Sequence, residues 1–84
     1  MSELARFVYI IQSDVEMDRF YVGLAEDFER RLAVHNFGGS AHTARLRPWR
    51  KVACVEFANP VSARAFERYL KSGSGRAFAK RHFV

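Results

Sequence analysis

One short stretch, Phe7-Val8-Tyr9-Ile10-Ile11, decides the fold of this chain. It consists of β-branched and aromatic residues and is too short for a helix, so it predicts a β-strand. Odd and even positions are equally apolar, which indicates that both faces are covered and that the strand is central in a sheet. Residues 19–24 predict a second strand. The six-residue connector between them, residues 13–18, suits an antiparallel hairpin.

A helix is expected directly after the hairpin. Asp27 is a good N-cap, and Glu29 adds negative charge to the first turn, where the helix dipole favours it. The helix should run from residue 28 to about residue 36. Gly38 and Gly39 should end it, because glycine is the usual residue just beyond a helix.

A long connector, residues 38–49, follows this helix. Long connectors in small domains are usually functional or mobile. Ser40 is placed to cap one short helical turn inside it. Trp49, which follows Pro48, is expected to anchor the connector rather than to stack on a nucleic-acid base.

The second half predicts one strand and two helices. Residues 52–57 form the third expected strand. Asn59-Pro60 is a helix start, since proline is accepted in the first turn, and a helix is expected from about residue 61 to residue 71. Residues 72–75, Ser-Gly-Ser-Gly, should break it before a short helix from residue 76 to about residue 82.

The resulting order is β-β-α-β-α-α. It predicts an α+β fold with a small three-stranded antiparallel sheet, strand order 2-1-3, flanked by helices. A chain of 84 residues is too short for two cores, so residues 1–84 are expected to form a single domain.

Composition excludes several classes of protein. With 49% apolar residues the chain can build a core, which excludes intrinsic disorder. No apolar run approaches the ~18 residues of a membrane span, and Met1-Ser2-Glu3-Leu4 does not begin like a signal peptide. The single cysteine, Cys54, excludes an internal disulfide and a cysteine zinc cage, and it should be inert core. We therefore expect a soluble cytoplasmic protein.

Charge is distributed unevenly along the chain. Residues 1–29 hold seven acids and two bases, a net charge of −5, whereas residues 30–84 hold twelve bases and two acids, a net charge of +10. A basic segment of this kind is typical of a protein with a polyanionic partner such as nucleic acid. A solvated arginine-rich surface is the ordinary alternative.

Several side chains with useful chemistry fall at regular spacings. Tyr9 and Tyr21 would project from the same face of the hairpin if its register is even, since side chains alternate along a strand. Gly23, inside a strand, often marks the close approach of another group. Arg31 and His35 are four residues apart and share one helix face.

Each of these residues also has an ordinary structural explanation. A strand tyrosine is more often packed with its hydroxyl satisfied, and a helical arginine such as Arg31 is usually solvated. His35 would suit the end of a helix as a cation, favoured there by the dipole. Glu67 could pair with Arg64 or Lys71 at helical spacing.

A series of short motifs covers nearly the whole chain. In order, they are Phe7-Val8-Tyr9, Tyr21-Val22-Gly23, residues 27–36, Arg47-Pro48-Trp49, residues 63–71 and the turn of residues 72–76. This series resembles the GIY-YIG nuclease domain over about residues 6–82, and looks closest to its small standalone bacterial members. Phe7 stands where the family name has glycine.

The resemblance implies a metal-dependent endonuclease that hydrolyses phosphodiester bonds, most simply in DNA. It implies that Tyr9 is the general base, or part of a relay with Tyr21, and that Arg31 contacts the scissile phosphate. Glu67 would be the ligand of one divalent metal, Mg²⁺ or Mn²⁺, and His35 fits the place of a histidine found in some members. One carboxylate can suffice, because Mg²⁺ keeps several waters and binds substrate phosphates.

A basic rim would then follow phosphates without reading bases, so sequence specificity should be low. Its expected members are Arg45, Arg47, Arg50, Lys51, Arg64, Lys71, Arg76 and Lys80. Two alternatives stay open: a catalytically silent nucleic-acid-binding module of the same fold, and a protein-interaction domain. The oligomeric state is also open.

Overall fold

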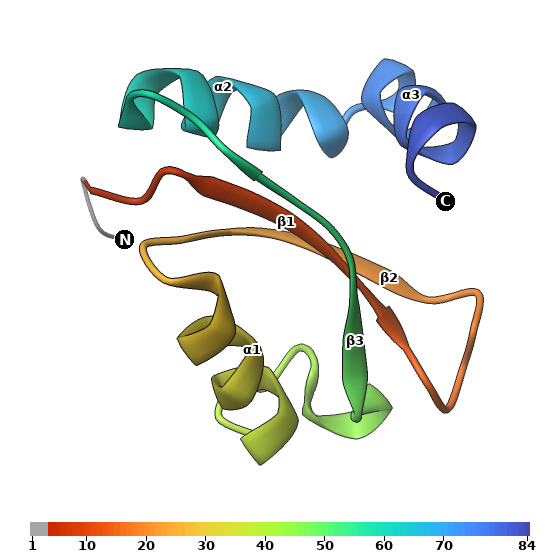
Figure 1. Ribbon diagram of the computed structural model, residues 1–84. Coiled ribbons are helices and arrows are strands. Elements are labelled where there is room, and N and C mark those ends of the chain that lie inside the picture. Colours follow the sequence, from red (N-terminus) through yellow and green to blue (C-terminus); the bar gives the residue numbers. More distant parts are fainter. Residues whose placement is uncertain (1–3) are drawn as a thin grey trace.

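Figure 1 shows three strands between two layers of helix in a computed structural model that describes residues 4–84. In chain order the elements are β1 (Phe7–Ser13), β2 (Phe20–Ala25), α1 (Phe28–Phe37), the 3₁₀ turn η1 (Ala44–Leu46), β3 (Trp49–Glu56), α2 (Pro60–Leu70) and α3 (Gly73–His82). All strand pairs are antiparallel and their order is β2-β1-β3. The predicted fold class, element order and strand order are confirmed.

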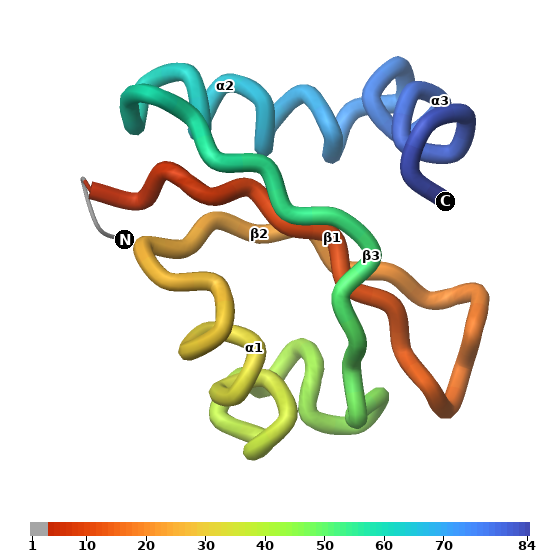
Figure 2. Tube along the Cα trace, viewed as in Figure 1, coloured from red at the N-terminus to blue at the C-terminus, as the bar shows by residue number. Residues whose placement is uncertain are grey.

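β1 is covered on both faces, as its continuous apolar sequence predicts. Val8 and Ile10 belong to an apolar cluster with the buried residues of α2, and Tyr9 and Ile11 to a second cluster with Phe28 of α1. Each of these four strand residues is at most 3% exposed. Figures 1 and 2 accordingly show α2 and α3 on one side of the sheet and α1 on the other.

The hairpin register decides which side chains share a face. Tyr9 pairs with Gly23, and Ile11 pairs with Tyr21. Since paired residues of an antiparallel ladder point to the same side, both tyrosines face the α1 layer. The hairpin therefore has the even register, and the prediction that Tyr9 and Tyr21 share one face is confirmed.

β3 starts three residues earlier than the expected residue 52. Asn36, on α1, holds the backbone of Trp49 twice, because its Oδ1 accepts from the Trp49 N–H at 2.5 Å and its Nδ2 donates to the Trp49 carbonyl at 3.0 Å. The indole N–H donates to the carbonyl of Thr43 at 2.8 Å. These bonds extend the strand and confirm that Trp49 anchors the connector.

The connector begins as expected, but its short helical turn differs from expectation. Gly38 ends α1 in the left-handed region, at φ 84°, as its position suggested. The short helical turn is η1, and its N-cap position is Thr43 rather than Ser40. Ser40 instead accepts the backbone N–H groups of Thr43 and Ala44 with its own carbonyl.

α3 begins at Gly73, so the expected break over residues 72–75 and the start at residue 76 were wrong. Ser72 is the N-cap, and its Oγ accepts from the N–H of Gly75 at 3.1 Å. Gly75 is buried, and a Cβ there would overlap the backbone carbonyl of Tyr69. The glycines therefore form the first turn of a helix that packs tightly behind α2, instead of interrupting helical structure.

The expectation that no signal peptide is present rests on Met1–Leu4, of which the first three residues lie outside the described range. Between residues 4 and 84, none of the helices has the length and apolar character needed to span a membrane.

The α2–α3 junction can be tested with a matched pair of glycine substitutions. Gly75→Ala should lower the free energy of unfolding by about 1–3 kcal/mol, because the new methyl group has no room beside the Tyr69 carbonyl. Gly73→Ala has open space and removes a poor helix former, so stability should stay equal or rise by up to about 1 kcal/mol. Urea denaturation of both variants measures the difference, and equal effects would contradict the packing described.

Candidate active site

The ring of Tyr9 lies across the backbone of the edge strand β2. Its partner in the register is Gly23, and a Cβ at Gly23 would lie only 2.6 Å from Tyr9 Cζ and still closer to its hydroxyl. The glycine is needed because it leaves room for this ring. The close approach expected at Gly23 is therefore that of Tyr9, and it brings the phenolic oxygen to the outer edge of the sheet.

A buried hydrogen-bond chain starts at this oxygen. The hydroxyl of Tyr9 lies 2.8 Å from Nε2 of His35, and Nδ1 of His35 lies 2.7 Å from Oγ1 of Thr43. His35 is 0% exposed, and Tyr9 and Thr43 are each 1% exposed. The helix α1 supplies the histidine and the connector supplies the threonine, so two separate elements meet on the strand tyrosine.

The charge of His35 and the hydrogen bond donated by Thr43 together give these bonds their direction. Burial, and secondly the charge of Arg31, lower the pKa of His35 from 6.5 to about 4, so the imidazole is neutral near pH 7. This excludes the alternative of a helix-terminal cation. A neutral imidazole carries one proton. Thr43 Oγ1 donates to the Ser40 carbonyl at 3.5 Å, so we assign the imidazole proton to Nδ1, which donates to Thr43, and Nε2 then accepts from the Tyr9 hydroxyl.

The charges around Tyr9 show which groups converge on it. Burial is the main cause that raises its pKa above 10. The guanidinium of Arg31 opposes the shift, as a hydrogen-bond donor and through its charge, whereas Tyr21 and Glu67 add to it through theirs. The Tyr21 ring is 6.4 Å from the Tyr9 ring and 5.1 Å from the His35 ring, centroid to centroid. The electrostatic surroundings of Tyr9 therefore include every other side chain singled out from the sequence as catalytic.

Glu67 reaches this group from the opposite layer. Its helix, α2, packs on the face of Val8 and Ile10, which is opposite to the face that carries Tyr9. Glu67 can still approach Tyr9, because β2 is an edge strand and has no neighbouring strand beyond it. A side chain from either layer can therefore approach the rim where the Tyr9 hydroxyl lies.

The Glu67 carboxylate is poorly hydrated and already paired. The residue is 8% exposed, and Oε2 lies 2.5 Å from Nζ of Lys71 one turn later. The helical pairing that the sequence offered as an alternative is thus present. Pairing does not remove the residue from the site, because its charge still contributes to the raised pKa of Tyr9.

The donor set allows only a sparsely ligated metal. Within residues 4–84 no three His, Cys, Asp or Glu side chains gather to hold an ion. Glu67 is the carboxylate whose charge reaches Tyr9, and its remaining oxygen partners would be waters and phosphates. That set fits a hard cation such as Mg²⁺, which keeps several waters and needs few protein ligands.

Thr43 is the residue that sequence reasoning missed. It lies in a connector with no helical or strand periodicity, and a threonine there carries no signal of its own. The signal available was indirect: the connector is long and follows a helix that carries Arg31 and His35. Cys54, by contrast, behaves as expected, because burial raises the pKa of its thiol and so suppresses the reactive thiolate.

The basic residues expected to form one rim form two groups. On the α1 side, Lys51 lies over the Phe28 ring, 5.7 Å from its centroid, and Arg50 pairs with Asp14 at 3.3 Å. Arg45 and Arg47 belong to the exposed connector near the same layer. Arg64, Lys71, Arg76 and Lys80 belong to α2, its C-cap and α3, on the other side of the sheet.

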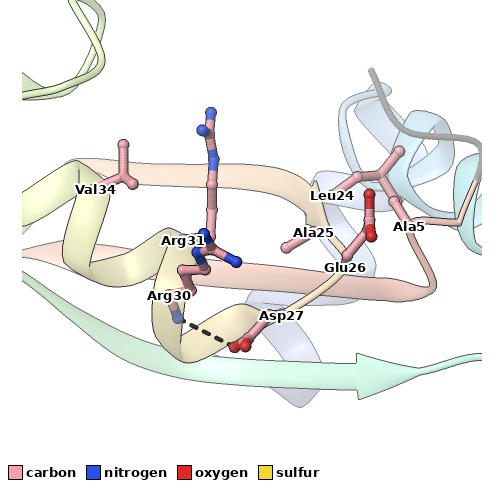
Figure 3. Close-up of a pocket in the computed structure, with 8 residues that line it drawn as sticks. All are labelled: Ala5, Leu24, Ala25, Glu26, Asp27, Arg30, Arg31 and Val34. Carbon is pink, nitrogen blue, oxygen red and sulfur yellow. Dashed lines mark hydrogen bonds between the residues drawn. The ribbon is translucent and has the colours of Figure 1, made fainter.

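Two hollows lie along β2, one on each side of Gly23. The Arg31 hollow, about 730 Å³, is bounded by Leu24 and Ala25 of β2 and by Arg30 and Arg31 of α1, as Figure 3 shows. The Tyr21 pocket, about 550 Å³, is bounded by residues 20–22 of β2 and by α2 and α3. The Tyr9 hydroxyl lies between them, because it overlies Gly23.

Comparison with known families agrees with this geometry. The family model described as the GIY-YIG catalytic domain matches residues 5–81. The chain belongs to the GIY-YIG family. The resemblance carried by the Phe7-Val8-Tyr9 and Tyr21-Val22-Gly23 motifs is confirmed over nearly its whole extent.

Fungal proteins are among the relatives of this GIY-YIG domain. It is 42% identical over 67 residues to the structure-specific endonuclease subunit SLX1 of Scheffersomyces stipitis, covering 71% of this chain and 20% of that protein. It is 42% identical over 66 residues to the same-named protein of Podospora anserina, covering 71% of this chain and 19% of that protein. The chain spans about a fifth of the length of these curated relatives. No solved structure gave a significant match.

The expected likeness to small bacterial members stays a prediction, since these relatives are fungal.

The buried neutral His35 predicts a specific dependence of stability on pH. Its pKa is lower in the folded chain than in the unfolded one, so only the unfolded chain takes up this proton between pH 6.5 and about pH 4. The stabilisation is complete above pH 6.5. It should fall by up to about 1.4 kcal/mol per pH unit, and by about 3 kcal/mol in all, as the pH drops to 4.

Urea denaturation at several pH values checks this. His35→Gln should flatten the profile in that window, while His42→Gln, at an exposed position, should leave it unchanged. A profile as steep in His35→Gln as in the wild type would show that other groups cause the acid lability.

Proposed function

We propose that this GIY-YIG domain is an endonuclease that hydrolyses phosphodiester bonds in DNA with the help of one divalent metal ion, Mg²⁺ or Mn²⁺. One observation carries the proposal. The buried chain Tyr9–His35–Thr43 ends in the phenolic oxygen of Tyr9, at the edge of the sheet. The charges of the Arg31 guanidinium and the Glu67 carboxylate both influence the pKa of that phenol.

Tyr9 is the group we assign to the attacking water. Its proton points to Nε2 of His35 and the Arg31 guanidinium donates to one side of the oxygen, which leaves the remaining lone pair to accept a hydrogen bond from water. As the water gives up its proton to Tyr9, the proton of Tyr9 can pass to His35. Thr43 holds the imidazole in the tautomer that can receive it, because Oγ1 occupies Nδ1.

Arg31 couples this proton transfer to substrate binding. In the free protein its charge helps burial to lower the pKa of His35. A phosphate bound to the guanidinium would neutralise that charge and so make protonation of His35 less costly. The same fork of donors would stabilise negative charge that develops on the phosphate oxygens. The proton transfer through His35 and the binding of the phosphate therefore both depend on Arg31.

Glu67 is the residue that would hold the metal ion. When bound, such an ion supplies positive charge that stabilises the phosphate in the transition state. Lys71 pairs with this carboxylate at 2.5 Å, so a metal ion held by Glu67 would compete with the ammonium group for the same oxygen. Tyr21, half-buried beside His35, is positioned to orient the substrate at the mouth of the site.

DNA is the substrate that the relatives and the charge favour. The relatives are named as structure-specific endonuclease subunits. The segment from residue 30 to residue 84 carries a net charge of +10, twelve bases against two acids, and can bind a polyphosphate backbone. Phosphate contacts position a duplex without reading its sequence, so specificity for sequence should be low.

Substitutions in the site should separate binding from hydrolysis. Glu67→Gln and Tyr9→Phe should each lower cleavage by at least about 100-fold and leave binding intact, because one loses the metal ligand and the other only a hydroxyl. Arg31→Ala should weaken both. Plasmid nicking with Mg²⁺, Mn²⁺ or a chelator, together with binding isotherms, measures these effects.

Two substitutions serve as matched controls. Glu56→Gln removes an acid at the exposed end of β3, and Tyr69→Phe removes a hydroxyl from the outer surface of α2; both should cleave like the wild type. A wild type that cleaves no plasmid, branched or single-stranded DNA in the presence of metal would refute the nuclease proposal. It would leave the silent nucleic-acid-binding module in its place.

Binding should be dominated by phosphate contacts. The double variant Arg45→Ala, Arg47→Ala should reduce the slope of log affinity against log salt by up to about two units, one for each lost contact. The double variant Arg6→Ala, Arg19→Ala removes the same charge from the acidic part of the chain and should not change the slope. Titrations of a labelled duplex at several salt concentrations compare them, and an unchanged slope in the first variant would remove the connector from the interface.

A further inference from the structure

The Tyr21 pocket is a second feature of the β2 edge, and the chemistry assigned to Tyr9 does not use it. Val22 of β2 and Leu70 of α2 form part of its apolar lining, and Ala79 of α3 closes one side. Phe20 lines it and is 42% exposed, so its side chain is open both to the pocket and to solvent. Its volume, about 550 Å³, falls within the ~300–1,000 Å³ of small-ligand sites.

The charged side chains that line this pocket are basic. Lys71, Arg76 and Lys80 line it, and none of its described lining side chains is acidic, although Lys71 is paired with Glu67 just outside it. An apolar cavity with an aromatic side chain at the mouth and cations around it matches a nucleobase flanked by its phosphates. Bases stack on aromatic side chains whatever their identity, and the adjoining phosphates need positive partners.

Two contacts connect the pocket to the site of hydrolysis. Tyr21 lines the pocket, and its ring also lies 5.1 Å from the His35 ring. Lys71 lines the pocket, and its Nζ lies 2.5 Å from the Glu67 carboxylate. The pocket lies on the α2 side of the sheet and the Tyr9 ring on the α1 side, so a nucleotide whose base enters the pocket would place its phosphate at the β2 edge, beside Lys71 and Glu67.

We propose that the Tyr21 pocket binds one unpaired nucleobase of a DNA substrate, next to the phosphate that is cut. The inference rests on the proposed function. A base in an intact duplex must first be unstacked and unpaired to enter, whereas an unpaired base at a bulge, flap or junction enters at little cost. The pocket would thereby favour DNA that has an unpaired base at this point, whatever the identity of that base.

The test is a binding measurement without hydrolysis. The probes are two duplexes in chelator, one fully paired and one with a single unpaired 2-aminopurine. The wild type should bind the second about tenfold more tightly, the effect of one stacked base, and the fluorescence of the probe should change as it leaves the DNA stack. Replacing the 2-aminopurine by an abasic site should remove the preference, and this comparison needs no protein variant.

Matched aromatic substitutions localise the effect. Phe20→Ala should reduce the preference to nearly one, whereas Phe37→Ala, an identical change at a 93% exposed position on α1, should keep it. Lys80→Ala should weaken binding of both duplexes and retain most of the preference, since it removes a phosphate contact and leaves the apolar cavity.

The outcomes distinguish this inference from the proposed function. If the wild type nicks DNA but binds the paired and unpaired duplexes equally, the inference about the pocket is wrong and the proposed nuclease function stands. If the wild type nicks no DNA but shows a preference that Phe20→Ala abolishes, the inference about the pocket stands and the proposed nuclease function is wrong. If Phe20→Ala instead converts a dimer to a monomer in sedimentation and leaves the preference unchanged, the pocket is an interface between copies and the inference is wrong.

Discussion

The overlap between the Tyr9 ring and the backbone of Gly23 is the constraint on which the site depends. Without a Cβ at position 23 the ring can lie flat across the edge strand, and its hydroxyl reaches the rim of the sheet. The same ring packs 5.3 Å from the Phe28 ring and 5.8 Å from the His35 ring, measured between centroids. One strand side chain thus sets the position of α1 and orients the imidazole that α1 carries.

Placement of the site at the rim of a small sheet lets two layers contribute to it. Arg31 and His35 come from one side of the sheet, and Glu67 from the other. A three-stranded sheet with β2 at its margin leaves a row of unpaired backbone groups there, which is a liability for aggregation. Exposed bases near that margin, such as Lys71 and Lys80, would discourage pairing with another strand.

Sequence patterns predicted most of the fold because its elements obey local rules. β1 has a continuous apolar run, and Asp27 and Asn59 both cap their helices as their residue types suggest, accepting from backbone N–H groups at 3.1 and 2.8 Å. The start of α3 was missed because Gly75 reads as a helix breaker. Its presence follows from the nearby carbonyl of Tyr69, a tertiary contact that no local rule contains.

The site was predictable where a family pattern marks it and unpredictable where only geometry does. Tyr9, Tyr21, Arg31 and Glu67 lie in recognisable motifs, and the structure brings them into one electrostatic environment. Thr43 has no motif, because its role arises from the path of an irregular connector. The layer from which Glu67 approaches was equally hidden, since helical periodicity gives the buried face of α2 but not the side of the sheet that it covers.

The hydrogen bond from the Trp49 indole to the Thr43 carbonyl has an optical consequence. Trp49 is the only tryptophan of the chain, it is 4% exposed, and its partner also contacts His35. Its emission therefore arises from a buried position that is hydrogen-bonded directly to Thr43, the inner member of the proton relay. The chain carries an intrinsic fluorophore whose spectrum reports on the inner end of that relay, and no label need be attached.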